Sequence, residues 1–298
     1  MKKRSTTLII CALFLAGLSL LLYPFIANEW NTYRQSKLIS NYEEVIAEKE
    51  GAGELDYAVE RERAVKYNEE LLPSILPDSF AVAEATEDNS AYMSCLNVSG
   101  DGMMGMIDIP KIDIEIPIYH TTEKEVLEKA AGHLEGSSLP VGGANTHAVI
   151  SAHRGLPSAS LFTDLDKLEE GDHFLIHVLN ETLSYEVDKI TVVEPEETDV
   201  LAVEDGEDLV TLLTCTPYGV NSHRLLVRGH RVPYVSENVE KEAPLLGAVS
   251  LHTNYLLWVI IGLAFTGAVI IMLFVFDRRL RKAAKKATAA EAEEPKRE

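Results

Sequence analysis

The chain has 298 residues, of which 46% are hydrophobic and 25% charged, and a formal net charge of −20. This composition excludes a disordered or low-complexity protein, and the acidic balance argues against a nucleic-acid partner, which selects a basic surface. Three cysteines are too few for a disulfide scaffold.

Two long apolar runs lie near the ends of the chain. Residues 7–27 carry no charge and follow three basic residues, and residues 255–276 carry none and precede a basic cluster that begins at Arg278. Each run is long enough for a helix to cross a hydrocarbon core of roughly 30 Å. The positive-inside rule predicts both ends in the cytoplasm and residues 28–254 outside. A cleaved signal peptide is the alternative for the first run, although no small-x-small cleavage site closes it.

The region between the two runs is strongly acidic. Removing the 3 basic residues of the N-terminus, and the 8 basic and 5 acidic residues from Asp277 onward, leaves 16 basic and 42 acidic residues, a net charge of −26. Such a surface attracts cationic partners or suits an anionic cell-wall setting, and it equally serves solubility alone.

The outer region changes character along its length. From residue 28 to about 72 apolar residues recur at helical spacing, and Gly51 and Gly53 divide this stretch into two helices. Residues 73–102 are rich in Pro, Asp and Ser and predict a long connection, a kind of segment that is usually functional or disordered. After Gly102, short runs with β-branched residues alternate with turn signals, and a helix is predicted at 123–131.

The short runs predict a mainly β fold, a closed or nearly closed barrel of seven to eight strands with short helices. The predicted strands are residues 104–109, 112–120, 146–152, 173–179, 183–193, 209–215 and 223–233.

Cys215 is the most informative candidate for chemistry. It ends one predicted strand, and the next strand begins near His223 after a turn-rich loop, so a hairpin would bring Arg224 near the thiol. A guanidinium beside a thiol at a strand end favours a nucleophile. Arg228 shares the strand face of Arg224. The alternatives are a small apolar Cys packed in the barrel and, in an oxidising exterior, a disulfide with Cys95.

A nucleophilic Cys also needs a His. Among nine candidates His153 stands out, because it ends an apolar run and meets a turn. His173 and His177 share a strand face, but no carboxylate or Cys completes a metal set with them.

These residues lie within a longer pattern. Residues 211–215 read Thr-Leu-Leu-Thr-Cys, which resembles the Thr-Leu-x-Thr-Cys signature of sortases, the membrane-anchored cysteine transpeptidases of Gram-positive bacteria. Other blocks resemble the class C, pilus-assembling sortases, namely residues 105–112, 117–120, 132–143, 153–157, 215–221 and 223–229. The resemblance spans roughly residues 67–233, and a topology with two membrane spans also fits that class.

The resemblance implies catalytic roles for His153, Cys215 and Arg224. It also implies a lid, an Asp-Pro-aromatic element over the active site, for which the closest match is Asp78-Ser79-Phe80, with Ser in place of Pro. The alternative is that Asp78 and Phe80 are ordinary loop residues.

The implied reaction needs no metal or organic cofactor. The thiolate would attack the Thr carbonyl of a Leu-Pro-x-Thr-Gly-like sorting signal, an imidazolium would protonate the leaving Gly amine, and the guanidinium would bind the carbonyl oxygen. A pilin lysine would then resolve the acyl-enzyme. Two other functions compete, attachment of surface proteins to an amine of the peptidoglycan precursor and a non-catalytic surface scaffold.

The predicted organisation follows from these assignments. It comprises a cytoplasmic basic end, 1–6; a transmembrane helix or signal anchor, 7–27; an extracellular helical segment with the lid loop, 28–102; the catalytic barrel, 103–235; a linker, 236–254; a second transmembrane helix, 255–276; and a cytoplasmic tail, 277–298.

Overall fold

The computed structural model describes residues 2–71, 76, 78–80 and 90–235, and residues 260, 262–264, 266, 267, 272, 275, 278 and 279 near the C-terminus. Its contacts divide the chain into two units, residues 1–22 with 249–298 and residues 23–248. The predicted linker 236–254 lies outside the described residues, as does most of the predicted span 255–276 and of the tail 277–298, so these assignments stay predictions.

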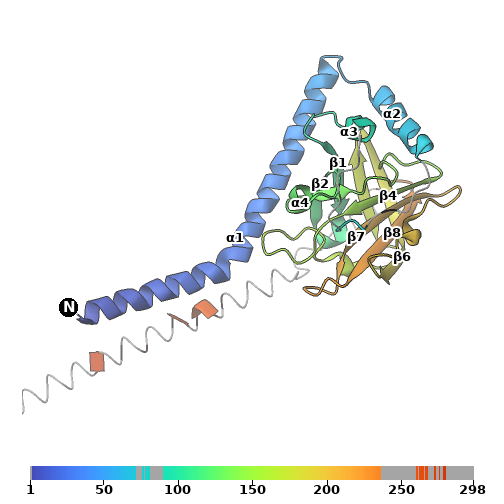
Figure 1. The fold of residues 1–298 in the computed structure, drawn as a ribbon. Coiled ribbons are helices and arrows are strands. Elements are labelled where there is room, and N and C mark those ends of the chain that lie inside the picture. The colour runs from blue at the N-terminus through green and yellow to red at the C-terminus, as the bar shows by residue number, and fades with distance from the viewer. Residues whose placement is uncertain are drawn as a thin grey trace, which may run out of the picture. The chain divides into compact units, whose positions relative to one another are not determined.

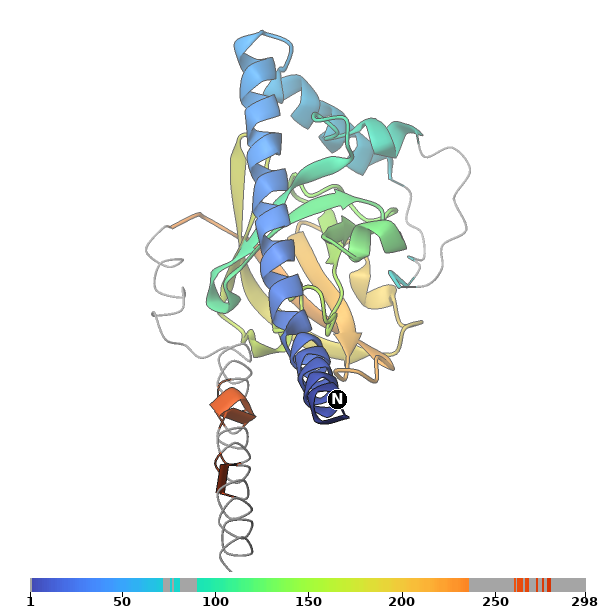
Figure 2. The same ribbon diagram turned by 90° about the vertical axis from the view of Figure 1, so that its left-hand side faces the viewer.

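The chain begins with a long helix, α1 (Lys2–Gly51), which continues through the predicted boundary between residues 27 and 28 (Figure 1). Among the described residues, the stretch Leu13–Gly51 is the one helix long and apolar enough to cross a membrane, by length and composition. Farther along the helix, Ile39, Tyr42 and Ile46 are buried in a cluster that includes barrel residues. The C-terminal part of α1 therefore packs along the barrel (Figure 2).

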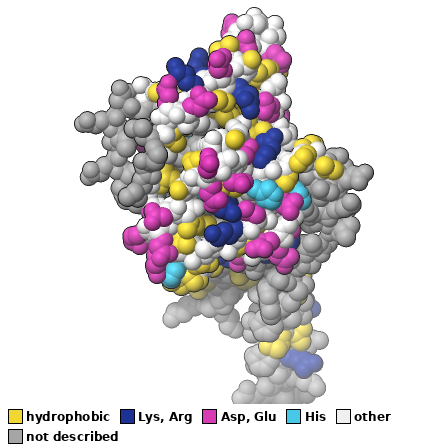
Figure 3. All heavy atoms as spheres, turned by 90° about the vertical axis from the view of Figure 1, so that its right-hand side faces the viewer, with side chains coloured by type: hydrophobic (Ala, Val, Ile, Leu, Met, Phe, Trp, Pro, Cys, Tyr) yellow, Lys and Arg dark blue, Asp and Glu magenta, His cyan; other side chains and the backbone are white. Residues whose placement is uncertain are grey.

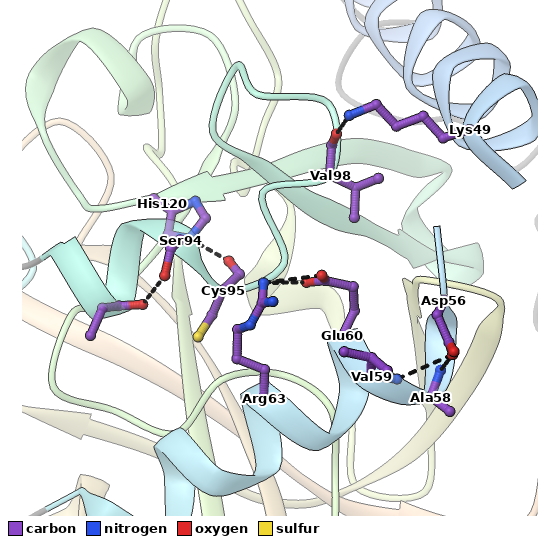
Figure 4. A network of polar contacts seen from close by, with 11 residues as sticks. Lys49, Asp56, Ala58, Val59, Glu60, Arg63, Ser94, Cys95, Val98 and His120 are labelled. Atoms are coloured by element: carbon purple, nitrogen blue, oxygen red, sulfur yellow. Dashed lines mark hydrogen bonds and ion pairs between the residues drawn. The ribbon is translucent and has the colours of Figure 1, made fainter. Parts of the chain in front are cut away.

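Helix α2 (Tyr57–Glu70) follows α1 after a break at the predicted place. Gly53 adopts a left-handed φ of 71°, and Asp56 caps α2 by accepting hydrogen bonds from the backbone N–H groups of Ala58 and Val59 (Figure 4). A side chain that caps a helix in this way satisfies N–H groups that have no partner within the helix. The two predicted helices are confirmed.

A third helix, α3 (Ser90–Ser94), lies in the segment that the sequence predicts as a connection. Its Tyr92 is almost fully buried, and the hydroxyl lies 2.9 Å from Nδ1 of His133. The Nε2 of His120 lies 2.9 Å from the carbonyl oxygen of Cys95, directly after the helix (Figure 4). Because five residues make too short a helix to be stable alone, these buried contacts explain why it forms here.

The body of the molecule is a closed barrel, whose strands follow the order β1-β2-β3-β4-β7-β8-β6-β5 (Figure 1). β5 pairs back onto β1 and closes the barrel. The strands are β1 (Met103–Ile109), β2 (Ile114–His120), β3 (Ala131–His133), β4 (Thr146–Ser151), β5 (His173–Val178), β6 (Glu181–Val193), β7 (Asp208–Thr216) and β8 (His223–Val232). The prediction of a mainly β, closed barrel is confirmed.

Two predicted elements are partly wrong. The strand expected from residue 112 begins at Ile114, because Pro110–Ile112 forms the 3-10 helix η1 and Asp113 has a φ of 53°. The helix expected at 123–131 is limited to α4 (Lys124–Leu127), because Ala131 already belongs to β3. β3 pairs with β2 and β4, and its Ala-Gly-His sequence has no β signal of its own.

Closure of the barrel requires a glycine in β1. A Cβ atom at Gly105 would lie 2.3 Å from the carbonyl oxygen of His177 in β5, closer than any real contact. We predict that Gly105→Ala lowers the stability of the protein by about 1–3 kcal/mol, the usual cost of overpacking. Thermal unfolding measures this, with Gly51→Ala as the control because nothing lies within 4 Å of that Cβ position. Equal melting temperatures for the two variants would contradict the prediction.

Candidate active site

Cys215 and Arg224 lie opposite one another on neighbouring strands. β7 and β8 are antiparallel, and their register pairs Cys215 with Arg224. Directly opposed residues project from the same face with Cβ atoms about 5 Å apart. Both residues are more than nine-tenths buried, although they lie at the loop end of the hairpin. The proximity that the hairpin argument predicts is present.

His153 reaches the same end of the barrel from β4, which runs parallel to β7. The N–H of Ala152 donates to the carbonyl of Leu213 at 3.2 Å, and the Thr214 hydroxyl donates to the carbonyl of Ala152 at 2.7 Å. These bonds extend the β4–β7 pairing past the end of β4, so His153 follows at the level of Cys215.

The predicted lid residues lie on this group. Asp78 accepts two hydrogen bonds from Arg224, from Nε at 2.7 Å and from Nη2 at 2.6 Å. The ring of Phe80 lies 5.3 Å from the ring of His153 and 5.3 Å from the guanidinium carbon of Arg224, measured to ring centroids. The structure thus brings all five predicted site residues together.

Burial and nearby charges set the protonation states of Cys215 and His153. Burial raises the pKa of Cys215; the Arg224 guanidinium opposes this shift, and the Asp78 carboxylate adds to it. Burial also lowers the pKa of His153. With Asp78 and Phe80 in place, the site therefore favours an uncharged thiol and an uncharged imidazole over the thiolate and imidazolium of the implied reaction.

An apolar patch on the outside of the barrel, which the sequence reasoning did not identify, adjoins Cys215. Leu76 and Phe80 pack on it from the segment before α3. Leu213 and Leu226 belong to the patch, two residues from Cys215 and Arg224, so alternation along the strands puts all four on one face. We call this cluster the outer patch; its members on the barrel and its loops are Leu134, Val149, Val193, Leu201, Leu213 and Leu226.

Arg154 is a second residue that the sequence reasoning missed. It follows His153 directly, its Nη1 donates to the hydroxyl of Thr216 at 3.2 Å, and it forms an ion pair with Asp166. Its side chain is only 8% exposed. Because Thr216 follows Cys215, this guanidinium joins the segment after His153 to the segment after Cys215.

The other candidates lie elsewhere. Arg228 is opposite Thr211 and binds Asp188, with Nε and Nη2 at 3.0 and 2.7 Å, and Glu204 at 2.7 Å. Four residues along the strand separate it from Arg224 by about 13 Å. Its guanidinium is thus held by carboxylates away from Cys215.

Cys95 and the histidines of β5 take no part in the site. Cys95 and Cys215 are both free, so no disulfide joins them. His177 lies 3.0 Å from the hydroxyl of Thr182, and His173 faces Glu186 at 3.6 Å. Within the described part of the chain, no group of three or more His, Cys, Asp or Glu side chains could hold a metal ion.

Comparison with known proteins agrees with this geometry. Residues 107–232 match the family model of the sortase domain. The crystal structure of sortase C-1 from Actinomyces oris is 47% identical, with 59% of this chain and 98% of that chain covered and a TM-score of 0.57. The crystal structure of sortase C from Streptococcus pneumoniae is 44% identical, with 66% and 97% covered and a TM-score of 0.59.

A more distant relative is sortase D of Bacillus subtilis (strain 168), 30% identical over 131 residues. The match covers 43% of this chain and 63% of that protein, less than two thirds of its length. Nearly the whole of each crystallised class C chain is covered at well over 30% identity. The chain therefore belongs to the sortase family, and its similarity to solved structures places it with the class C sortases.

Proposed function

We propose that this protein is a cysteine transpeptidase that cleaves a Leu-Pro-x-Thr-Gly-like sorting signal between Thr and Gly and transfers the acyl group to a pilin lysine. The observation that carries the proposal is the pairing of Cys215 with Arg224, with His153 at the adjoining strand end. A thiol, an imidazole and a guanidinium at one site supply a nucleophile, a proton carrier and an oxyanion donor. The pneumococcal sortase C structure is described in terms of pilin substrate specificity, which supports the choice of acceptor.

The proposed reaction proceeds in two steps, acylation of Cys215 and transfer of the acyl group to a lysine. The Cys215 thiolate attacks the Thr carbonyl, a thioester forms, and the Gly amine leaves with a proton from His153. The amine of the incoming lysine then attacks the thioester, His153 takes its proton, and Cys215 leaves as thiolate. Arg224 donates hydrogen bonds to the carbonyl oxygen while it carries negative charge in each step. Neither step draws on a metal or an organic cofactor.

The outer patch suits the apolar part of such a signal. Its leucine and valine side chains lie beside Cys215 on the same barrel face, and Leu76 and Phe80 cover them. We propose that Asp78-Ser79-Phe80 acts as a lid, because a substrate carbonyl must reach Cys215 while Phe80 lies on His153 and Asp78 occupies Arg224. The enzyme would then exist mainly closed, and its apparent affinity would fall with the open fraction.

We also propose that the protein is held at the cell membrane. Residues 7–27 and 255–276 would anchor the chain with both ends in the cytoplasm and the barrel outside the cell membrane. Substrates bearing a sorting signal would meet the enzyme on the same membrane, which raises their effective concentration.

Mass spectrometry of the full chain with a sorting peptide and either a pilin or a peptidoglycan-like amine tests the reaction and separates the two acceptors. Absence of an acyl group on Cys215 would favour the non-catalytic scaffold.

We predict that Cys215→Ala abolishes transpeptidation, because no other group at the site is a comparable nucleophile. His153→Ala should lower the rate by about 10²–10⁴, the usual contribution of a proton carrier. Arg224→Ala should lower it by about 10²–10³, the usual loss for an oxyanion donor. Peptide cleavage with product analysis measures these rates. Cys95→Ser and Arg228→Ala are the controls and should retain activity; a loss in Arg228→Ala larger than that in Arg224→Ala would reverse the assignment of the two guanidinium groups.

We predict that the double variant Asp78→Ala/Phe80→Ala reacts faster with small thiol reagents and turns over short sorting peptides faster. The physical reason is that both contacts that hold the lid on Arg224 and His153 are removed. The variant should also lose some thermal stability. Rates of Cys215 alkylation, measured in a Cys11→Ser/Cys95→Ser background, test this. Unchanged rates would show that these residues do not cover the thiol.

The same variants carry a pH prediction. Burial and Asp78 both raise the pKa of Cys215, so removing the lid contacts should lower that pKa, while Arg224 continues to favour the thiolate. The thiolate is the reactive form, so alkylation rises with pH through this pKa. The midpoint of the alkylation rate against pH should therefore move to lower pH in Asp78→Ala/Phe80→Ala. A midpoint that stays in place or moves upward would contradict the electrostatic role given to the lid.

A further inference from the structure

Two loops beside the candidate catalytic residues carry no charge. Residues 155–163, which we call the His loop, come after His153, and residues 217–222, the Cys loop, come after Cys215. Charged residues make up 25% of the chain, and acidic side chains are spread over the face of the molecule in Figure 3. Neither loop therefore opposes contact with an apolar or interfacial environment through a charge of its own.

The two loops contact each other and present apolar side chains. Gly155 has a φ of +77°, and a Cβ atom there would lie 2.9 Å from Cε2 of Tyr218, so the ring of Tyr218 lies against the backbone of the His loop. Tyr218 is nevertheless 59% exposed, and Val220 is 70% exposed. An aromatic and an aliphatic side chain therefore project from the Cys loop.

The His loop is bound to α1 at the first residue after the apolar run 7–27. The Oδ1 atom of Asn28 accepts hydrogen bonds from the backbone N–H and the hydroxyl of Ser160, both at 2.8 Å. Farther along the loop, the N–H of Phe162 donates to the carbonyl of His153 at 3.1 Å. If residues 7–27 cross the membrane, Asn28 lies where the chain leaves the hydrocarbon, and Ser160 lies beside it.

Aromatic residues follow Asn28 on α1. Trp30 and Tyr33 are 63% and 60% exposed, with ring centroids 6.0 Å apart. At about 1.5 Å per residue, both lie within roughly 10 Å of the end of the apolar run. Trp and Tyr are enriched at this level of a membrane, because their rings are apolar and their polar atoms can reach water.

We propose that the His loop and the Cys loop form a rim that contacts the outer surface of the bilayer, with Tyr218 and Val220 in the headgroup region. The inference rests on the proposed anchoring by residues 7–27. The acidic residues beside the His loop do not oppose it, because Asp166 pairs with Arg154 and Asp164 with Lys167. Such a rim would turn the entrance of the site toward the membrane surface, where a tethered sorting signal leaves the bilayer.

The test uses the full chain in phosphatidylcholine vesicles, with Trp30→Phe and Trp258→Phe so that a single new tryptophan reports. Val220→Trp should be quenched by brominated phosphatidylcholine at least about twofold more than Val59→Trp, as expected for a side chain within the interface. Val59, which is 49% exposed, is the matched control. It lies near the start of α2, which follows the C-terminal end of α1. That end of α1 is about 35 Å along the helix from Asn28. Equal quenching of the two variants would overturn the proposal.

A second variant distinguishes lipid contact from substrate contact. Val220→Ser should slow turnover of a vesicle-tethered sorting peptide by about twofold or more and leave turnover of the soluble peptide unchanged. An equal loss with both peptides would assign the loop to the substrate and overturn the proposal. Flotation with the vesicles tests the anchoring by itself, and turnover of the soluble peptide tests the transpeptidase function, so failure of either is seen separately.

Discussion

The ion pair between Arg224 and Asp78 holds the site in the state that the structure describes. Arg224 is the cross-strand neighbour of Cys215, and both oxygens of Asp78 occupy its Nε and Nη2 groups, with side chains 10% and 15% exposed. Removing one partner from a buried pair leaves the other charge without compensation, which typically costs about 3–5 kcal/mol. Separation of Asp78 from Arg224 would therefore require water or a substrate oxygen in its place. The guanidinium that would bind the oxyanion is the same group that binds Asp78.

This arrangement couples access to reactivity. Phe80 lies on His153 and Asp78 binds Arg224, the cross-strand neighbour of the thiol. Burial shifts the pKa of Cys215 upward and that of His153 downward. Moving Phe80 and Asp78 away would admit water and remove a negative charge, and both changes favour the thiolate beside Arg224. A closed site is thus uncharged and protected from oxidation, since the thiolate is the form that reacts. Opening by substrate would supply the nucleophile where it is needed.

Sequence reasoning captured the parts that depend on local pattern. The strand run before Cys215 and the turn after it predicted the hairpin, and the hairpin placed Arg224 opposite the thiol. It missed β3, because Ala131–His133 is a strand only through its neighbours β2 and β4. It also missed the outer patch, although Leu213 alternates with Cys215 along the strand. The reason is that a strand pattern alone does not show whether a second apolar face is covered by other residues. The Arg154 contact with Thr216 was out of reach because it joins ends of strands that only the parallel β4–β7 pairing brings together.

Contacts at several levels hold α1 against the body of the molecule from Asn28 onward. Beyond Asn28, side chains of the helix bind backbone carbonyls of the barrel and of the segments that lead into it, with Gln35 on Lys129, Tyr42 on Met104 and Lys49 on Val98. Bonds to backbone do not depend on a partner's side chain, and here they are spread over about four turns of helix. A helix held at several levels cannot swing about a single hinge. The hydrogen bond between Ser160 and Asn28 thus holds the loop that follows His153 next to residue 28, the first residue after the apolar run 7–27.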